Sequence, residues 1–157
     1  MPVITLFTEI KAPINQVFNL ARDLDLHKIS TGKSNEVAIA GKMSGLINEG
    51  EFVTWRATHL GVRQTLTTKI TKMNFPDFFQ DVMLNGAFKK MTHDHYFEEN
   101  GEVTIMKDVF DFESPFGFIG KIFNTLFLTK YMERLLFERN RVIKEYAEEN
   151  LNPSPRN

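Results

Sequence analysis

The chain has 157 residues, with 19 basic and 20 acidic side chains and no cysteine, so its length predicts one domain with a sizeable core. The balanced charge argues against nucleic-acid binding, which needs clustered Lys and Arg, and the lack of cysteine excludes disulfides, thiolate catalysis and Cys-ligated zinc. Residues 1–11 do not resemble a signal peptide and no run is long enough for a membrane span, so we expect a cytoplasmic protein.

The first half of the chain predicts a strand, two short helices and three further strands. Residues 2–10 form the expected first strand, and Pro13 favours a helix that begins directly after it. A second short helix is expected over 23–29. Strands are then expected over 36–41, 51–59 and 62–73, with Leu60-Gly61 joining the last two. This turn places Trp55 on the inward face, opposite Leu66.

Two Asn-Gly pairs predict three antiparallel strands between residues 75 and 112, because Asn-Gly favours two-residue hairpin turns. With turns at 85–86 and 100–101, Lys107 is expected opposite Asp94 and His93 opposite Asp108. Lys90 is expected opposite both Asp81 and Asp111 on the outer face. The predicted inward face carries Phe78, Gln80, Val82, Leu84, Met91, His93, His95, Phe97, Met106, Asp108, Phe110 and Phe112.

Ser114-Pro115 ends the predicted sheet, and the rest of the chain is expected to be helical to about Asn150. Apolar side chains lie on two nearly opposite arcs of this helix, so we expect a break near Thr129. The segment before the break would cap a cavity or contact a partner, such as a second copy of the chain. Residues 1–150 form the expected domain, and 151–157 a disordered tail.

Several short motifs are similar to the START-related superfamily, which includes birch-pollen-allergen-like proteins, polyketide cyclases and lipid-transfer domains (SRPBCC). They are Ile10-x-Ala12-Pro13-x-x-x-Val17-Phe18, Gly86-x-Phe88, His93-x-His95-x-Phe97 and Pro115-x-Gly117-x-x-Gly120. The resemblance implies an α+β helix-grip fold: a seven-stranded antiparallel sheet wrapped around a long C-terminal helix, with two short helices between strands 1 and 2. It also implies a hydrophobic cavity between the sheet and the long helix.

His93 and Asp108 are the sharpest candidates for chemistry. A carboxylate beside an imidazole can fix its tautomer and raise its basicity, but the same pair can serve only to satisfy two buried polar groups. A metal site made of His93, His95 and Asp108 matches a known ligand set. Apolar neighbours surround these three residues, so we expect no metal and no other cofactor.

The leading hypothesis is therefore a non-enzymatic protein that binds a small apolar molecule or lipid with one polar group. The expected ligand-binding residues are His93, His95, Asp108 and Trp55 for orientation, with Met91, Met106, Phe110 and Phe123 as apolar walls. The first alternative is an aromatase/cyclase-like enzyme that acts on a polyketide-like substrate. The second is a protein-interaction module with a vestigial pocket.

Overall fold

The computed structural model describes residues 2–114 and 124–151. Its elements follow the predicted order of one strand, two short helices, six strands and a long helix. The strands are β1 (Val3–Ile10), β2 (Val37–Gly41), β3 (Phe52–His59), β4 (Val62–Asn74), β5 (Phe78–Asn85), β6 (Lys90–Asn100) and β7 (Val103–Glu113). The helices are α1 (Ile14–Ala21), α2 (Leu24–Ser30), the 3-10 helix η1 (Gly32–Ser34), the π-helix η2 (Asn124–Leu128) and α4 (Thr129–Leu151).

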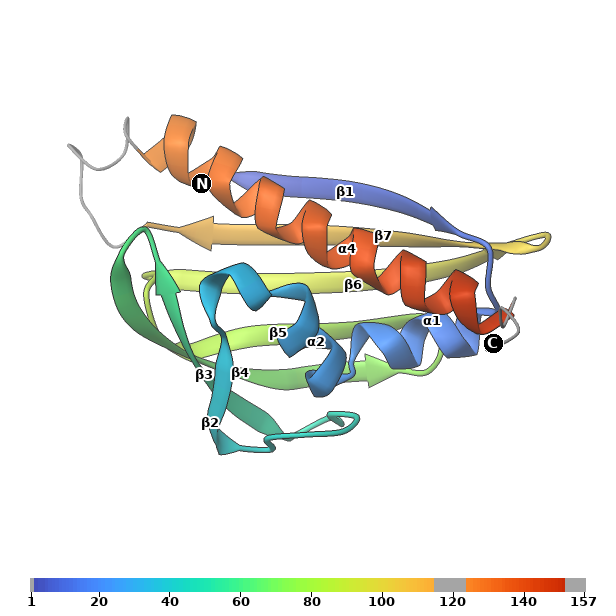
Figure 1. Ribbon diagram of the computed structural model, residues 1–157, viewed down its shortest axis with the longest axis horizontal. Helices are drawn as coiled ribbons and strands as arrows, with labels where there is room; N and C mark the ends of the chain where they lie inside the picture. The colour runs from blue at the N-terminus through green and yellow to red at the C-terminus, as the bar shows by residue number, and fades with distance from the viewer. Residues whose placement is uncertain (1, 115–123, 152–157) are drawn as a thin grey trace, which may run out of the picture.

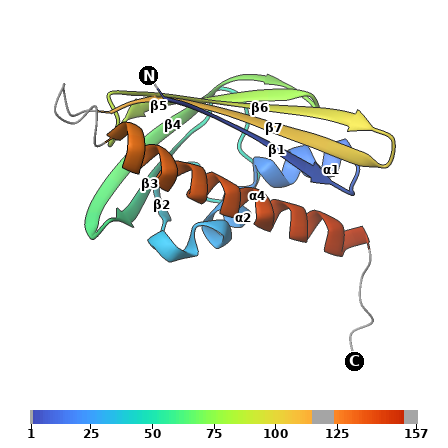
Figure 2. The ribbon, with the colours of Figure 1, turned by 90° about the horizontal axis from the view of Figure 1, so that it is seen from above.

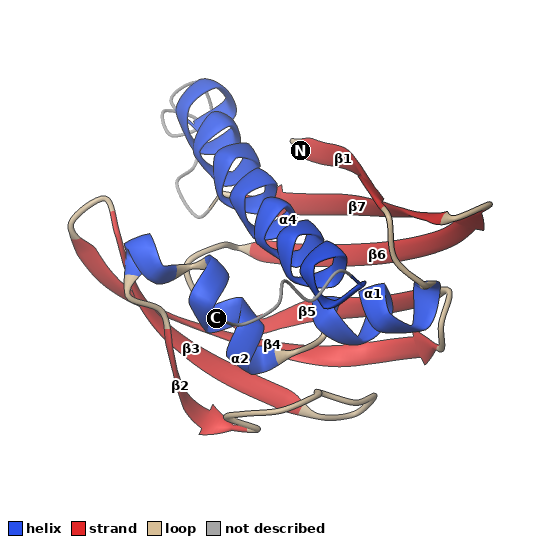
Figure 3. Ribbon diagram, turned by 45° about the vertical axis from the view of Figure 1, so that its right-hand side comes forward, coloured by secondary structure: helices blue, strands red, loops and turns tan. Residues whose placement is uncertain are grey.

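The seven strands form one antiparallel sheet in the order β1-β7-β6-β5-β4-β3-β2. The sheet curves around α4, which crosses its inner face, and α1 and α2 lie on the same side (Figures 1 and 2). α4 packs against β1, α1 and α2, while β3 and β4 bend away from it (Figure 3). This arrangement confirms the predicted helix-grip fold.

The two short helices begin where the sequence predicts. Pro13 is the N-cap of α1, with a φ of −60°, and the side chain of Asp23 caps α2 by accepting hydrogen bonds from the amides of Asp25 and Leu26 at 2.9 and 3.2 Å. Phe18 of α1 is fully buried, and its ring contacts the ring of Phe79 edge-on with centroids 5.3 Å apart. These contacts fix α1 against the sheet.

The β6–β7 hairpin has a different register from the predicted one. Asn100 pairs with Val103, so its turn consists of Gly101 and Glu102 rather than Asn100 and Gly101. Gly101 adopts a φ of +64°, which glycine reaches without strain. Each β6 residue is therefore opposite a β7 residue two positions further along than expected.

This shift corrects the predicted cross-strand pairs but preserves the predicted faces. His95, rather than His93, is opposite Asp108, and Lys107 is not opposite Asp94. Side chains alternate with a period of two, so a shift of two leaves each on its original face. The inward-facing residues of these two strands are buried as predicted: Met91, His93, His95, Phe97, Met106, Asp108, Phe110 and Phe112.

The prediction of which β5 side chains face inward was wrong. Asn85 remains in the strand, and residues 86–89 form a four-residue connection to β6. Gly86 is needed for close packing rather than for a hairpin turn, because a Cβ there would lie 3.1 Å from Cα of Leu66. Asp81 consequently pairs with His93 instead of Lys90.

A register shift by an odd number of residues moves every side chain of a strand to the opposite face of the sheet. Phe79 and Asp81 therefore face inward. The residues that were predicted to do so lie on the outer face: Phe78, Gln80, Val82 and Leu84. The β3–β4 prediction is confirmed, since Trp55 is opposite Leu66.

The C-terminal helix changes type where a break was expected, because η2 ends at Leu128 and regular α-helix begins at Thr129. Within η2, Leu126 and Phe127 are exposed. The Pro115–Gly120 motif, Phe123 and the tail 152–157 lie outside the described residues. No helix in the described ranges is long and apolar enough to cross a membrane.

Candidate functional site

A cavity of about 640 Å³ lies between the inner face of the sheet and the helices α2 and α4. Its walls are mostly apolar, with side chains from β3, β4, β6, β7 and α4. Representative lining residues are Trp55, Leu66, Met91, Phe110, Met132 and Leu136. A volume of this size is typical of sites for drug-sized ligands, which measure about 300–1,000 Å³.

The structure separates the predicted ligand-binding residues into two layers. Trp55, Met91, His93, His95 and Phe110 line the cavity. Met106 and Asp108 do not line it and are completely buried behind this first layer. Phe123 is not among the described residues.

Asp108 is the centre of a buried polar network. Nε2 of His93 donates a hydrogen bond to Oδ1 of Asp108 at 2.9 Å, diagonally across the strand pair. Nδ1 of His95 lies 2.9 Å from the same oxygen, outside the alignment of a hydrogen bond. Both imidazoles thus converge on one carboxylate oxygen.

The long helix supplies two further members of this network. Nδ2 of Asn140 donates to Oδ2 of Asp108 at 2.6 Å, and Nη1 of Arg139 lies 3.4 Å from Oδ1. Arg139 also donates to the carbonyl of Ala21 at 2.9 Å, which ties α4 to the end of α1. The network therefore connects the sheet, α1 and α4.

Arg139 and Asn140 were missed in the sequence. The available signal was their position beside Leu136 and Ile143 on the buried side of α4. Polar side chains among buried apolar ones need partners. Only the tertiary structure identifies those partners.

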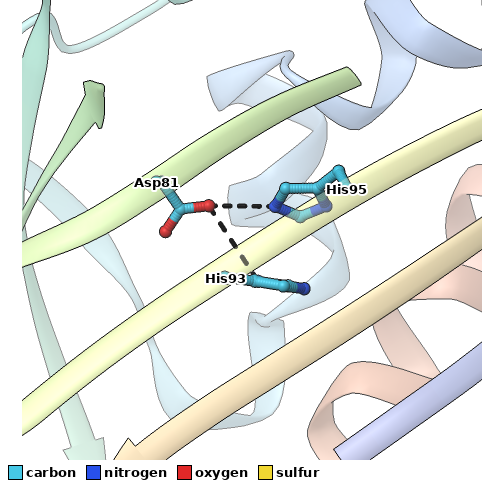
Figure 4. Close-up of side chains that lie close together, drawn as sticks. All are labelled: Asp81, His93 and His95. Carbon is cyan, nitrogen blue, oxygen red and sulfur yellow. Dashed lines mark hydrogen bonds and ion pairs between the residues drawn. The ribbon is translucent and has the colours of Figure 1, made fainter. Parts of the chain in front are cut away.

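Asp81 was assigned to the outer face but belongs to the cavity wall. Its Oδ2 accepts a hydrogen bond from Nε2 of His95 at 2.9 Å and lies 4.0 Å from Nδ1 of His93 (Figure 4). The ring of Phe79 stacks on His95 with centroids 4.1 Å apart. His95 is therefore held between two carboxylates and fixed in orientation.

The two histidines have opposite electrostatic environments. Burial, together with the neighbouring charge of His95, lowers the pKa of His93 to about 4. Burial also disfavours charge on His95, but its contacts with Asp108 and Asp81 outweigh burial and raise its pKa. The protonated form is thus favoured at His95 and the neutral form at His93.

The carboxylates respond to the same contacts. Burial opposes ionisation of Asp108, yet the interactions with His93 and His95 hold its pKa well below the ordinary value. For Asp81, burial is likewise outweighed by the hydrogen bond from His95 and the charges nearby, so its pKa is lowered. Both groups are anionic at neutral pH.

A second polar group lies on another part of the cavity wall. Nε2 of His27 is 3.2 Å from Oε2 of Glu36, and the imidazole lies against the Trp55 ring at a centroid distance of 4.6 Å. Nδ1 of His59 is 2.9 Å from the hydroxyl of Tyr131. These residues all line the cavity.

One set of side chains has the composition of a metal site. Asp81, His93 and His95 each offer a ligand atom, and the three atoms lie within 4.8 Å of one another. The set differs from the one considered in the sequence by containing Asp81 instead of Asp108. Asp108 instead lies behind the two imidazoles.

The fold is shared with solved structures of low sequence identity. The protein TTHA0849 from Thermus thermophilus aligns over 93% of this chain and 99% of that chain, with a TM-score of 0.72 and 17% identity. A START superfamily protein from Mycobacterium smegmatis aligns over 94% and 98%, with a TM-score of 0.71 and 12% identity. Major latex-like protein 151 from Panax ginseng aligns over 93% and 97%, with a TM-score of 0.67 and 16% identity.

These similarities confirm the helix-grip fold that the resemblance of the sequence motifs implies. At the level of sequence, no family model and no curated protein matches the chain.

Proposed function

We propose that the protein binds a small apolar molecule or lipid, which carries a polar group, in the cavity between the sheet and α4, without catalysing a reaction. The observation that carries this proposal is the cavity itself, with its 640 Å³ volume and mainly apolar wall. Such a wall favours an apolar ligand body because its burial removes apolar surface from water. At about 30 Å³ per water molecule, the volume corresponds to roughly 20 waters.

The polar residues of the wall would orient this ligand. His95 and Arg139 offer positive charge at one place, and Glu36 and Tyr131 offer an acceptor and a hydroxyl at another. Precisely placed polar groups in an apolar pocket determine ligand orientation. Trp55, Met91 and Phe110 would contact the apolar body, whereas Asp108 acts only by holding the two imidazoles.

The electrostatics of His93 favour binding over acid–base catalysis. A general base is most effective when its pKa lies near the working pH. With a pKa of about 4, His93 is a weak base at neutral pH. The aromatase/cyclase-like alternative would require it to accept a proton there.

Filling the cavity tests the proposal. Ala57 is buried in β3 and lines the cavity, whereas Ala40 in β2 is exposed and does not. We expect a fatty acid to change the fluorescence of Trp55, the only tryptophan, in the wild type and in Ala40→Phe. Ala57→Phe should weaken this binding at least tenfold while circular dichroism shows an intact fold.

Equal affinities in Ala57→Phe and Ala40→Phe would contradict binding in this cavity. Native mass spectrometry of the purified wild type should in addition detect a co-purified apolar molecule. Wild-type protein that takes up no fatty acid or apolar dye would favour the protein-interaction alternative.

A further inference from the structure

The cluster of Asp81, His93 and His95 has features beyond those that ligand orientation requires. Its three ligand atoms lie within 4.8 Å of one another, and all three side chains line the cavity. Two imidazoles with one carboxylate suit Zn²⁺ and related transition metals better than Mg²⁺ or Ca²⁺, which prefer oxygen ligands alone.

The two distances around Asp81 lie on either side of the separation of about 3.3 Å between two ligand atoms of a tetrahedral zinc ion. Its Oδ2 lies 4.0 Å from Nδ1 of His93 and 2.9 Å from Nε2 of His95 (Figure 4). Zinc binds nitrogen and oxygen at about 2.0–2.2 Å, so one ion can contact both atoms of the wider pair. The rings of His93 and His95 are 3.8 Å apart between centroids, which brings the second imidazole within reach.

The other nitrogen of each ring is directed toward Asp108, as in many metal sites. His93 donates through Nε2 to Asp108, and Nδ1 of His95 is 2.9 Å from the same carboxylate oxygen. Metal-binding histidines commonly direct their other nitrogen to a carboxylate, which fixes the tautomer and the ring orientation. This arrangement leaves Nδ1 of His93 and Nε2 of His95 for an ion.

The charges of the site also call for a cation. Asp81 and Asp108 are two buried carboxylates, and Arg139 is the guanidinium that contacts Asp108. Without a further positive charge this group carries a net charge of −1, which is costly in a buried place. A proton on His95 brings the net charge to zero, and a divalent ion in place of that proton would bring it to +1.

We propose that Asp81, His93 and His95 bind a divalent transition-metal ion of the zinc class, with Asp108 orienting both histidines. Three protein ligands leave a further coordination position open toward the cavity, as in zinc sites that bind a water or a substrate. The ion would then present a Lewis acid to the polar group of a molecule in the cavity. The metal site does not depend on the proposed apolar ligand.

The test uses the full chain after chelator treatment and dialysis, with Zn²⁺ alone as the titrant. Isothermal titration calorimetry should show one Zn²⁺ per chain with micromolar or tighter affinity. Asp81→Asn should weaken binding at least tenfold. Asp94→Asn is the matched control, because Asp94 lies on the outer face between the two histidines and accepts a hydrogen bond from Gln80, and its affinity should be unchanged.

A second measurement keeps the proposal testable if Asp81→Asn does not fold. Imidazole ¹⁵N spectra of the wild type should show Zn²⁺-induced shifts for His93 and His95, and none for His27 and His59. Absence of stoichiometric binding, equal affinity in both Asp variants, or shifts confined to His27 and His59 would each overturn the proposal. Fatty-acid binding is measured separately with EDTA present, so a failure of one proposal is distinguishable from a failure of the other.

Discussion

Replacing Asp108 by Asn should destabilise the fold strongly, because Asp108 is the shared partner of a buried charged network. Its carboxylate lies within 2.9 Å of both imidazoles and 3.4 Å of Arg139, and its side chain is 1% exposed. Asn keeps the shape but removes the negative charge. Arg139 then loses its buried counter-ion, and His95 keeps only Asp81.

Removing one partner of a buried ion pair costs about 3–5 kcal/mol. A domain of this size has a total stability of about 5–15 kcal/mol, so Asp108→Asn should lose a large share of it. With about 2–4 °C per kcal/mol for domains of 150–250 residues, the melting temperature should fall by roughly 6–20 °C.

Urea unfolding followed by circular dichroism, with EDTA present, measures this loss. Asp94→Asn on the outer face is the control and should cost less than about 1 kcal/mol, as most surface substitutions do. If Asp108→Asn does not fold, Asn140→Ala removes the 2.6 Å hydrogen bond to Asp108 and should lower stability measurably. A loss below about 1 kcal/mol in Asp108→Asn would refute the reasoning.

Three further predictions concern other parts of the structure. Burial opposes ionisation of Glu36, but its interactions with His27 and Thr31 outweigh burial and lower its pKa. The stabilisation is therefore complete above the unfolded pKa of about 4.3 and is lost as pH falls through the lower folded pKa. Glu36→Gln should thus be less stable than wild type at pH 7 in urea unfolding, with the difference shrinking below about pH 4; a pH-independent difference would contradict this. The variant His93→Phe should fold, and in competition titrations it should lose more affinity for a fatty acid than for a hydrocarbon dye of similar size. Equal losses of affinity would argue against a role of His93 in orienting the ligand. Amide exchange should be faster across Asn124–Leu128 than across Leu135–Tyr146, because the exposed π-helical turn opens at lower free energy than the packed helix; equal protection of the two segments would contradict this.

The sequence was sufficient for the fold and for the inner faces of β3, β4, β6 and β7. Alternation of apolar and polar residues determines a strand's face, and a shift of two residues in the β6–β7 register did not change it. The face of β5 depended on the turn after it. Asn85 stays in the strand and Gly86 packs against Leu66. A two-residue turn at Asn85-Gly86 therefore predicts a register that is wrong by an odd number of residues, and it places Asp81 on the outer face instead of the inner one.

The candidate site was predictable only in part for a similar reason. His93 and His95 follow from alternation within one strand, and the contact of His93 with Asp108 survives as a diagonal hydrogen bond. Arg139 reaches Asp108 from a helix 31 residues away in the sequence. No periodicity in the chain specifies which strand residue a buried helical arginine meets.

Methionine methyl NMR tests the central proposal, ligand binding in the cavity, most directly. Met91 and Met132 line the cavity, Met43 is exposed, and Met106 is buried in the core away from it. On addition of a fatty acid to protein labelled at the methionine methyl carbons, the account predicts saturable shifts of Met91 and Met132 with Met43 and Met106 unchanged. Unchanged Met91 and Met132 signals, or a shift of Met43 alone, would contradict it.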